Sequence, residues 1–276
     1  MTLNKFFAGF LVVCGAIAVI VLAAHGPQTS QAQITPADPL TSWPDYSTSG
    51  PGLVVPLTPD GDLVGDGYKL VATTYEAIGP DTDKPFAGNR LACQNCHLDG
   101  GTRRSALPLV GVFKTYPKFS ARSGRDISLT ERIDECMTRS MNGRRLPADS
   151  REMAAFQAYL RFIGEPAPVY APPPSPAPQP PDATRGAEVY GRICATCHQP
   201  HGLGKRQAMG YAFPPLWGPD SFNDGAGMDR FASAVGFIRH NMPRGVDPAN
   251  PQLTLQEAWD VVAFLQSRPR PHYEGR

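Results

Sequence analysis

The chain has 276 residues, enough for one large or two small domains, and its formal net charge is only +1 at pH 7. Such a balance argues against a polyanionic partner such as nucleic acid, which is bound through a strong positive excess. Its 27 Gly and 30 Pro residues exceed a fifth of the chain, so we expect abundant loops.

The N-terminus resembles an export signal. Lys5 precedes an apolar run of 19 residues, 6–24, and a polar stretch follows. Ser30-Gln31-Ala32 offers a small-x-small cleavage site, which predicts a signal peptide over residues 1–32 and location in the periplasm. The run is also near the minimum length of a membrane span, so an uncleaved anchor stays open, and only then would the chain contact the membrane.

A predicted first domain covers residues 40–164 and begins with an expected helix over 67–78. It carries Cys93-Gln94-Asn95-Cys96-His97. Two cysteines three apart and a following histidine are typical of a c-type haem site, in which both thiols bind the haem vinyl groups and the histidine binds the iron. Cys194-Ala195-Thr196-Cys197-His198 repeats the pattern. A single motif could be half a zinc site, but two in an exported chain favour two covalently bound haem c groups.

A second helix of this domain is expected from Ser128, because Ser128 and Glu131 have the spacing of a capping box, and Asn142-Gly143 is a good stop. Cys136 lies in this helix, and positions three or four residues away on a helix are neighbours. Its neighbours in this sense are Arg132, Arg139 and Ser140. The sequence therefore predicts a patch with one thiol, two guanidinium groups and a hydroxyl.

Cys136 is the one cysteine left over after the haem motifs and the N-terminal Cys14, and it follows His97 by 39 residues. A thiolate can be the second axial ligand of haem iron and lowers its reduction potential. Arg132 and Arg139 would favour the ionised form. An inert buried cysteine and an intermolecular disulfide are the alternatives, and Met137 and Met141 are other possible ligands in this region.

Basic residues are concentrated in the same region. Residues 103–145 contain ten Lys and Arg but four Asp and Glu, an excess of +6 in a chain of net charge +1. This pattern fits either a basic surface that docks an acidic redox partner or a pocket in which arginines bind an oxyanion.

The domain is expected to end with a helix over 150–163, for which Asp149 and Glu152 form a cap. Residues 165–181 contain nine prolines and are predicted to be a Pro-rich linker, either extended in polyproline II or folded back along the surface.

The predicted second domain, 182–276, has an expected helix over 183–194 that leads into its haem motif, and a final helix that begins at a Thr254–Glu257 capping box. Two such helices crossing beside the haem resemble the class I cytochromes c, with Gly186 and Tyr190 expected against Trp259. The predicted fold class is therefore mainly α, with two tandem class I cytochrome c-like domains.

The second axial ligand of this haem is expected to come from a loop. Met242 follows His198 by 44 residues, in the run Asn241-Met242-Pro243, and a loop thioether suits that position. Met209, Met228 and His240 are the competing ligands, and Met242 as ordinary core filler is the other reading.

Several further motifs resemble the tetrathionate-forming thiosulfate dehydrogenases, which are periplasmic dihaem cytochromes c. The resemblance covers most of residues 65–270, and its most specific part is the Cys-x-x-Arg-Ser-Met-Asn-Gly run. It rests on both haem motifs, on Tyr116-Pro117 with Ser120-Ala121-Arg122, on residues 132–143 and on His240-Asn241-Met242-Pro243.

The resemblance implies that His97 and Cys136 bind a catalytic haem, that His198 and Met242 bind an electron-transfer haem, and that Arg122, Arg132 and Ser140 lie near the substrate. Helical spacing adds Arg139 to this set. Some relatives have an exchangeable Lys ligand before the distal Met; here Asn241 occupies that position, so no such exchange is expected.

The expected reaction joins two thiosulfates into tetrathionate and passes two electrons to an external one-electron acceptor, such as a small cytochrome c or a high-potential redox protein. Three alternatives stay open: a non-enzymatic dihaem electron carrier, a sulfur-oxidation cytochrome that works with a partner subunit, and tetrathionate reduction by the reverse reaction.

Overall fold

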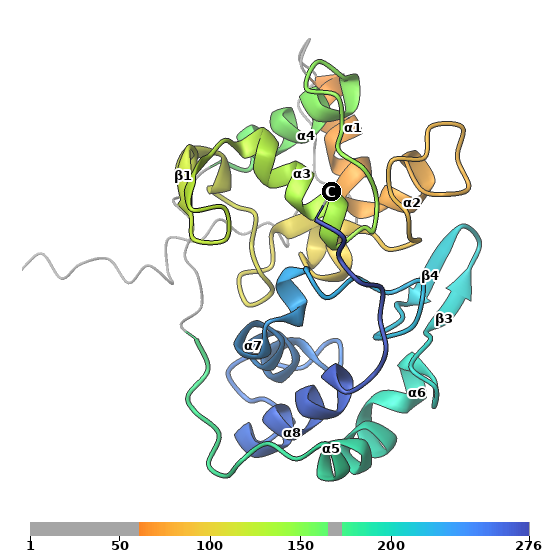
Figure 1. Ribbon diagram of the computed structural model, residues 1–276, viewed down its shortest axis with the longest axis vertical. Coiled ribbons are helices and arrows are strands. Elements are labelled where there is room, and N and C mark those ends of the chain that lie inside the picture. The colour runs from red at the N-terminus through yellow and green to blue at the C-terminus, as the bar shows by residue number, and fades with distance from the viewer. Residues whose placement is uncertain (1–60, 165–172, 276) are drawn as a thin grey trace, which may run out of the picture. The chain divides into compact units, whose positions relative to one another are not determined.

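The computed structural model describes residues 61–164 and 173–275, and this part of the chain is mainly α-helical (Figure 1). One group of helices precedes residue 164 and a second follows residue 182, in keeping with two tandem domains. The expected signal peptide, residues 40–60 and residues 165–172 of the expected linker lie outside the described residues. Within 61–164 and 173–275, no helix has the length and apolar character needed to cross a bilayer.

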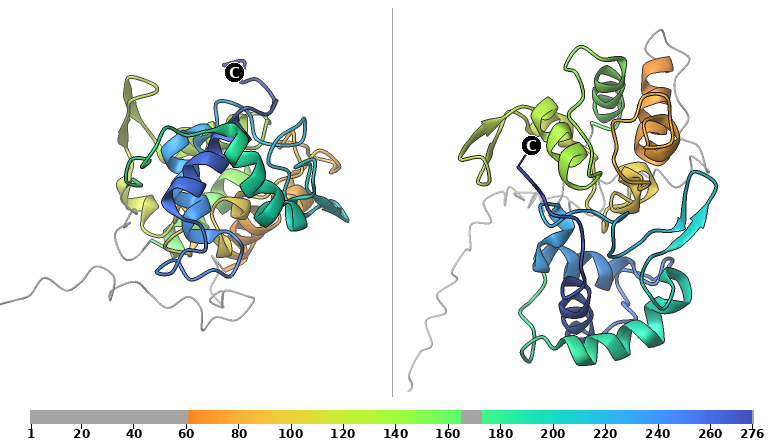
Figure 2. Two further views of the ribbon diagram at one scale, coloured as in Figure 1. Left: turned by 90° about the horizontal axis from the view of Figure 1, so that it is seen from below. Right: turned by 45° about the vertical axis from the view of Figure 1, so that its right-hand side comes forward.

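The first group of helices packs around a core made by Val71, Met137, Met153 and Tyr159, each almost fully buried. α1 lies beside α4, which places the two ends of this group together (Figure 2). The elements are α1 (Gly61–Ala72), α2 (Thr74–Ala77), α3 (Leu129–Arg139) and α4 (Arg151–Phe162), with β1 (Lys118–Ser120) antiparallel to β2 (Arg125–Ile127).

The expected helix over 67–78 is two helices, and the first begins six residues earlier than predicted. The chain breaks at Thr73, whose backbone has φ −135° and ψ 49°. The predicted apolar face survives the break, because Leu70, Thr74 and Ile78 are all buried. The break leaves Thr74 at the start of α2, where its hydroxyl meets the first haem motif.

The capping prediction is confirmed for α3 and wrong for α4. Ser128 Oγ accepts the Glu131 N–H at 3.1 Å, and Glu131 Oε2 accepts the Ser128 N–H at 2.7 Å. At α4 the cap is Ser150 instead of Asp149, since the Ser150 hydroxyl accepts the Met153 N–H at 3.1 Å. A serine directly before the first helical residue has the reach to satisfy that free N–H group.

The second group begins with α5 (Ala183–Val189), which continues through one π-helical turn, Tyr190–Cys194, into α6 (Ala195–His198). The second haem motif therefore forms the end of a continuous helical segment. Thr254 and Glu257 form the predicted capping box at the start of the last helix. The remaining elements are β3 (Lys205–Gln207) antiparallel to β4 (Gly210–Phe213), α7 (Phe231–Asn241) and α8 (Leu255–Gln266).

The crossing of α5 and α8 depends on Gly186, as predicted, but its partner is different. A Cβ at Gly186 would lie 2.0 Å from Asp260 O and 2.8 Å from Phe264 Cβ, so only glycine allows this approach. Tyr190 packs on Phe264, at 5.3 Å between ring centroids. Trp259 instead stacks on Phe231 of α7, on another face of α8. In the first group, a glycine likewise allows two helices to pack closely, because a Cβ at Gly67 of α1 would lie 2.1 Å from Ala155 O of α4.

The described part of the Pro-rich segment, 173–181, contacts α8. Trp259 Nε1 donates to Ser175 O at 3.1 Å, and the Gln179 N–H donates to Gln256 Oε1 at 2.8 Å. Of the two conformations expected from the sequence, these residues adopt the one that follows the protein surface.

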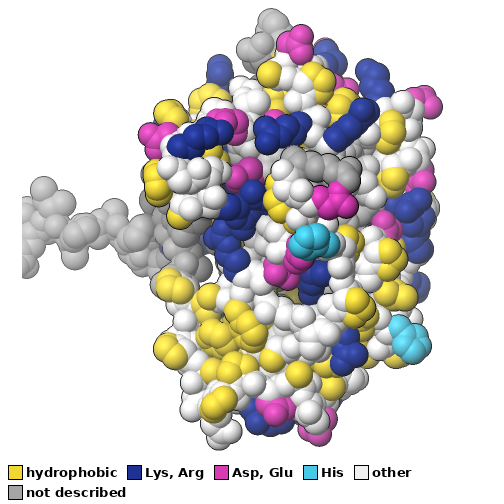
Figure 3. Space-filling view, in the orientation of Figure 1, with side chains coloured by type: hydrophobic (Ala, Val, Ile, Leu, Met, Phe, Trp, Pro, Cys, Tyr) yellow, Lys and Arg dark blue, Asp and Glu magenta, His cyan; other side chains and the backbone are white. Residues whose placement is uncertain are grey.

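Basic and apolar side chains are unevenly distributed on the face shown in Figure 3. Lys and Arg side chains gather over the half that contains α3 and β1, whereas hydrophobic side chains form a patch over α7. The basic excess counted for residues 103–145 thus lies in the first group of helices.

Candidate functional site

The first haem motif lines a cavity of about 440 Å³. Residues Cys93–Asn95 form a 3₁₀ turn that follows an extended Ala92. Thr74 holds the turn, because its Oγ accepts the Cys93 N–H at 3.1 Å and lies 3.5 Å from Cys93 Sγ. Cys96 and His97 line the cavity as well, and apolar walls are provided by Val71, Leu109, Leu129, Met137, Phe156 and Leu160. Two free thiols and an imidazole facing an apolar cavity fit a covalently attached haem.

The orientation of His97 suits an axial ligand. Its Nδ1 lies 2.5 Å from the carbonyl oxygen of Leu107, so Nδ1 carries the proton and Nε2 is left for a metal. Burial lowers the pKa of His97 to about 4, which keeps the ring neutral, the form that binds metals. Burial raises the pKa of Cys93 to about 11 and that of Cys96 to about 12, as expected for thiols in apolar surroundings.

Cys136 and the predicted polar residues line the same cavity as the haem motif. These residues are Arg122, Arg132, Arg139 and Ser140, so all the residues proposed for the first site are brought together. The pKa of Arg132 is raised, first by its electrostatic interaction with Cys136, and burial opposes the shift. The thiol and this guanidinium therefore form an electrostatic pair inside the cavity wall.

Arg139 is the most deeply buried of the three arginines, with 8% of the residue exposed. Its Nε and Nη1 make no hydrogen bond within the described residues, and Nη1 lies 3.4 Å from Glu135 Oε1 as an ion pair. Donors left without hydrogen bonds in a buried guanidinium are costly unless a ligand accepts them. A buried arginine on a cavity wall whose donors are not all used in hydrogen bonds is therefore suited to an oxyanion.

Arg122 reaches the cavity from the turn between β1 and β2. Its Nη1 donates to Gly225 O at 2.9 Å, a carbonyl of the second half of the chain. Burial lowers its pKa, and the charge of Arg139 adds to the effect. Lowered arginine pKa values still leave the group charged at neutral pH. Five basic side chains line the cavity against one acidic side chain, Glu135; the basic residues are Lys118, Arg122, Arg132, Arg139 and Arg230.

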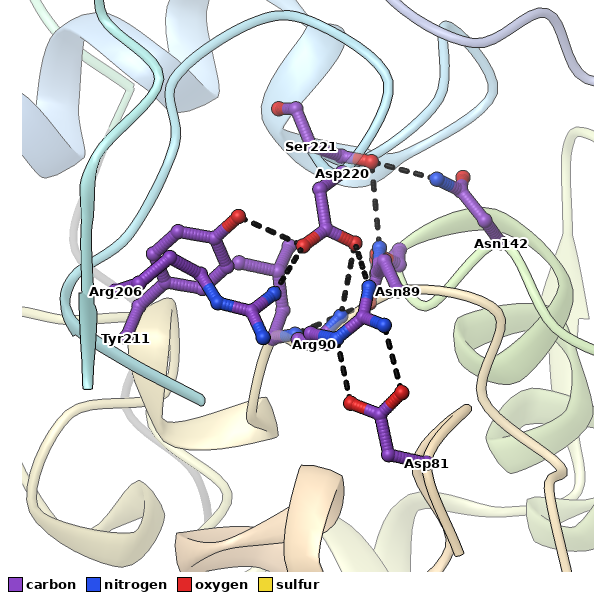
Figure 4. A network of polar contacts seen from close by, with 10 residues as sticks. Asp81, Asn89, Arg90, Asn142, Arg206, Tyr211, Asp220 and Ser221 are labelled. Carbon is purple, nitrogen blue, oxygen red and sulfur yellow. Dashed lines mark hydrogen bonds and ion pairs between the residues drawn. The ribbon is translucent and has the colours of Figure 1, made fainter. Parts of the chain in front are cut away.

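Ser140 follows α3. Asn89 links its carbonyl to Ser221 of the second half of the chain, and Figure 4 shows the contacts of Asn89 and Asn142 with Ser221. Asn89 Nδ2 donates to Ser140 O at 2.9 Å and to Ser221 O at 3.3 Å. Asn142 Nδ2 donates to the same Ser221 carbonyl at 2.6 Å. Beside them, Asp220 accepts from the Arg90 N–H and from the Tyr211 hydroxyl. This network holds the end of α3 in place at the cavity.

Sequence reasoning did not select three groups of residues that belong to the site. Glu135 contacts Arg132 Nη1 at 3.3 Å as well as Arg139, and its helical spacing from both was the available signal. Met228 and Arg230 line the cavity from the second half of the chain. Met228 was considered only as a ligand of the second haem, and nothing in the local sequence of either residue indicates a contact with the first site. Thr74 was treated only as part of a helix face.

The second haem motif is built in a similar way. His198 is buried, and its Nδ1 lies 2.8 Å from Pro214 O, which leaves Nε2 for a metal. Burial lowers the pKa of His198 and raises that of Cys194 to about 11. Cys194 and Cys197 are unpaired thiols on either side of the helical turn that carries them. These residues fit a second covalently attached haem.

Met242 lies directly after α7, where its N–H donates to Ile238 O at 2.9 Å. Its side chain is partly buried and packs against a cluster formed by Leu98, Ala106 and Phe237. The role of Met242 as the distal ligand stays a prediction.

Among the described residues, no group of three or more His, Cys, Asp and Glu side chains is arranged to hold a metal ion.

Two families match the chain in tandem. Residues 83–169 match "SoxA/TsdA, cytochrome c domain", and residues 183–269 match "Cytochrome c". These domains imply two covalently bound haem c groups, as expected from the two motifs.

The chain is also similar to whole proteins. It is 42% identical over 230 residues to thiosulfate dehydrogenase of Allochromatium vinosum, covering 79% of this chain and 83% of that protein. It is 37% identical to thiosulfate dehydrogenase of Stutzerimonas stutzeri over 76% of this chain and 71% of that one. Among solved structures, thiosulfate dehydrogenase (TsdBA) of Marichromatium purpuratum in its as-isolated form matches with a TM-score of 0.74 at 32% identity, over 85% of this chain and 50% of that chain. This chain belongs to the thiosulfate dehydrogenase family of dihaem c-type cytochromes.

Proposed function

We propose that this chain oxidises thiosulfate by joining two molecules into tetrathionate, with release of two electrons. The observation that carries the proposal is the composition of one cavity: a c-type haem motif, the Cys136 thiol and the guanidinium groups of Arg122, Arg132 and Arg139 all line it. The relatives named thiosulfate dehydrogenase support the same reaction.

The cavity arginines can offset the electrostatic repulsion between the two thiosulfate anions. Two dianions must approach each other, and one pair of unit charges ~4 Å apart at an effective dielectric near 20 repels by about 4 kcal/mol. Arg139 offers donors that make no hydrogen bond within the described residues, and Arg122 and Arg132 add two further positive charges. We assign these groups to sulfonate oxygens, with the Ser140 hydroxyl as an additional donor.

Cys136 is proposed to act as a nucleophile as well as a ligand. Its thiolate sulfur forms a bond to the outer sulfur of one thiosulfate, and this oxidation releases two electrons. The second thiosulfate then attacks that outer sulfur, which breaks its bond to Cys136 and releases tetrathionate, while Cys136 returns to the thiolate. Arg132, which interacts electrostatically with Cys136, keeps a positive charge beside the sulfur at both stages.

The two haems supply one-electron acceptance, so together they can take up both electrons of the reaction. We assign His97 and Cys136 to the iron of the first haem, and His198 and Met242 to that of the second. Residues 40–164 would then form the catalytic domain and residues 182–276 the electron-transfer domain. The final acceptor is proposed to be an external one-electron carrier, either a small cytochrome c or a high-potential redox protein.

The proposed location is the periplasm. The apolar run 6–24 and the small-x-small site that ends at Ala32 support export, and attachment of haem to exported chains fits the two motifs. The chain would contact the membrane only if this N-terminal segment stays attached.

The test is thiosulfate oxidation by the purified holoprotein, with ferricyanide as acceptor and tetrathionate quantified as product. One tetrathionate for every two ferricyanides reduced is the expected result. The assay is run from mildly acidic to neutral pH, with both haems first shown to be present by their absorption and by mass.

The other outcomes separate the alternatives. Absence of product across this pH range, with both haems attached, contradicts the proposal and favours a non-enzymatic electron carrier. Activity that appears only when a second protein is added would favour a cytochrome that works with a partner subunit. Measured reduction potentials and the reverse assay, with reduced dye and tetrathionate, show which direction prevails.

A further inference from the structure

The C-terminal segment, residues 269–275, runs beside the loop of residues 218–225, which places Phe222 on the wall of the first cavity. The Gly218 N–H donates to Pro269 O at 2.8 Å, and the Asp224 N–H donates to Pro271 O at 3.1 Å. Both carboxylate oxygens of Asp224 contact the segment: Oδ2 lies 2.6 Å from His272 Nδ1, and Oδ1 accepts the Tyr273 N–H at 2.7 Å. The segment is therefore attached at both ends of this loop.

The loop in turn contacts two of the four arginines that line the cavity, Arg122 and Arg139. Gly225 O accepts the Arg122 Nη1–H at 2.9 Å. Asn223 binds the last turn of α3, since its Nδ2 donates to Thr138 O at 3.0 Å and its N–H donates to Arg139 O at 3.3 Å. The loop thus fixes one arginine through its side chain and another through its backbone.

Tyr273 completes the connection. Its ring lies under the Arg139 guanidinium, with 4.8 Å from Cζ to the ring centroid. The same ring covers Gly225, where an added Cβ would lie 2.7 Å from Tyr273 Cγ. Tyr273 is not among the residues that line the cavity, so its ring packs on the guanidinium without occupying space that is open to a ligand.

We propose that Tyr273 is a positioning residue for the oxyanion site: the C-terminal segment holds Arg139 by a cation–π contact and Arg122 through Gly225, so that both guanidinium groups face the cavity together. This inference rests on the proposed function. It assigns to the last residues of the chain an effect on substrate affinity, with no contact to the reacting sulfur atoms.

The experiment compares the wild-type holoenzyme with Tyr273→Leu and Tyr273→Phe. Two quantities are measured: kcat and KM for thiosulfate with ferricyanide, and the Kd of the oxidised enzyme for sulfate, an unreactive oxyanion, by calorimetry at constant ionic strength. A partly desolvated cation–π contact corresponds to an affinity change of about 3- to 10-fold. We expect Tyr273→Leu to raise KM and the sulfate Kd together by this factor while kcat changes less than about twofold. Tyr273→Phe keeps an aromatic ring and should change both constants less than Tyr273→Leu does.

A second variant reaches the same contact without altering the ring. Gly225→Ala places a methyl group against Tyr273 and should raise KM and the sulfate Kd in the same direction. Thermal unfolding midpoints show whether each variant is folded. A Tyr273→Leu enzyme with unchanged KM and sulfate Kd overturns the inference, and so does a loss of kcat with unchanged sulfate binding.

The wild-type measurements separate this inference from the proposed function. A wild-type enzyme that binds sulfate but does not oxidise thiosulfate contradicts the proposed function and leaves the sulfate Kd of Tyr273→Leu as the test of the inference. A wild-type enzyme that neither oxidises thiosulfate nor binds sulfate contradicts both.

Discussion

Ser105 and Asn241 are joined by two hydrogen bonds: Ser105 Oγ donates to Asn241 Oδ1 at 2.8 Å, and Asn241 Nδ2 donates to Ser105 O at 2.9 Å. Asn241 is fully buried, and its Nδ2 also donates to Phe237 O at 2.9 Å. Ser105 lies two residues before Leu107, whose carbonyl orients His97. The residue before the proposed distal ligand of the second haem is therefore tied to the loop that orients the proximal ligand of the first.

This arrangement predicts that the second haem keeps the same axial ligands in both oxidation states. The Asn241 amide is engaged by Ser105 and Phe237, and it supplies no amine to compete with Met242. Magnetic circular dichroism of the oxidised and reduced holoprotein should show methionine ligation throughout. Met242→Leu should remove that signature and the matched variant Met228→Leu should keep it; a ligand exchange on reduction would contradict the prediction.

Replacing the proposed ligand and nucleophile should separate catalysis from haem attachment. We expect Cys136→Ala to retain both haems, because Cys93, Cys96, Cys194 and Cys197 are unchanged, but to abolish thiosulfate oxidation. The reduction potential of the first haem should rise, since electron donation by the thiolate is lost. Activity assays and spectroelectrochemistry measure the two effects.

The control for this variant is Met137→Leu, a similar-sized substitution at the next residue of α3, which should leave the potential of the first haem nearly unchanged. Full activity of Cys136→Ala would remove the thiol from the mechanism, whatever the potential.

Arg139→Lys should weaken substrate binding. Lysine keeps the charge but loses the planar set of donors that can bind a sulfonate at two points. A hydrogen bond to a charged group contributes ~1.5–3 kcal/mol, so KM for thiosulfate should rise about 10- to 100-fold. Steady-state kinetics at fixed ionic strength give the value.

Arg145→Lys is the matched control for this change. Arg145 is an exposed residue of the same basic region that does not line the cavity. Equal KM values for Arg139→Lys and the wild type would show that the buried guanidinium is not a substrate contact.

Much of the site could be predicted because it is local in sequence. Cys136, Arg132, Arg139 and Ser140 share one helix and its end, and a helix places residues three or four positions apart side by side. The two haem motifs are local for the same reason. Helix starts at Ser128 and Thr254 were also predicted, since a capping box is complete within four residues.

Features that depend on contacts between distant segments were missed or misassigned. The partner of Gly186 was predicted to be Trp259, but rotation of α8 presents Asp260 and Phe264 to α5. A hydrophobic stripe identifies a buried face and leaves open which of its residues meets which helix. Arg230 and Tyr273 reach the first site from far along the chain, and no local pattern reveals such a contact.

The close crossing of α5 and α8 makes a prediction about stability. Gly186→Ala would place a Cβ 2.0 Å from Asp260 O, so the helices must separate, and we expect a loss of about 1–3 kcal/mol. Gly191→Ala, five residues on in the same helical segment, meets nothing within 4 Å and is the matched control. Denaturant unfolding followed by circular dichroism compares the two, and equal midpoints would contradict the crossing.

The capping box of α3 predicts that the free energy of unfolding falls as the pH is lowered into the acid range. Hydrogen bonds from Arg125 and from the Ser128 backbone lower the pKa of Glu131 from its ordinary 4.5 to about 2. Because the folded pKa lies below the unfolded one, the unfolded chain binds this proton more readily. The contribution of Glu131 is therefore complete above pH 4.5 and is lost as the pH falls towards 2.

Glu131→Gln should remove this contribution. Its free energy of unfolding should be lower than that of the wild type at neutral pH, and the difference should shrink as the pH falls from 4.5 to about 2. Glu188→Gln removes one exposed carboxylate from α5 and controls for the loss of a surface charge. Urea unfolding at a series of pH values measures the difference; a gap between wild type and Glu131→Gln that stays constant across this range would show that the carboxylate does not stabilise the start of α3 through its ionised form.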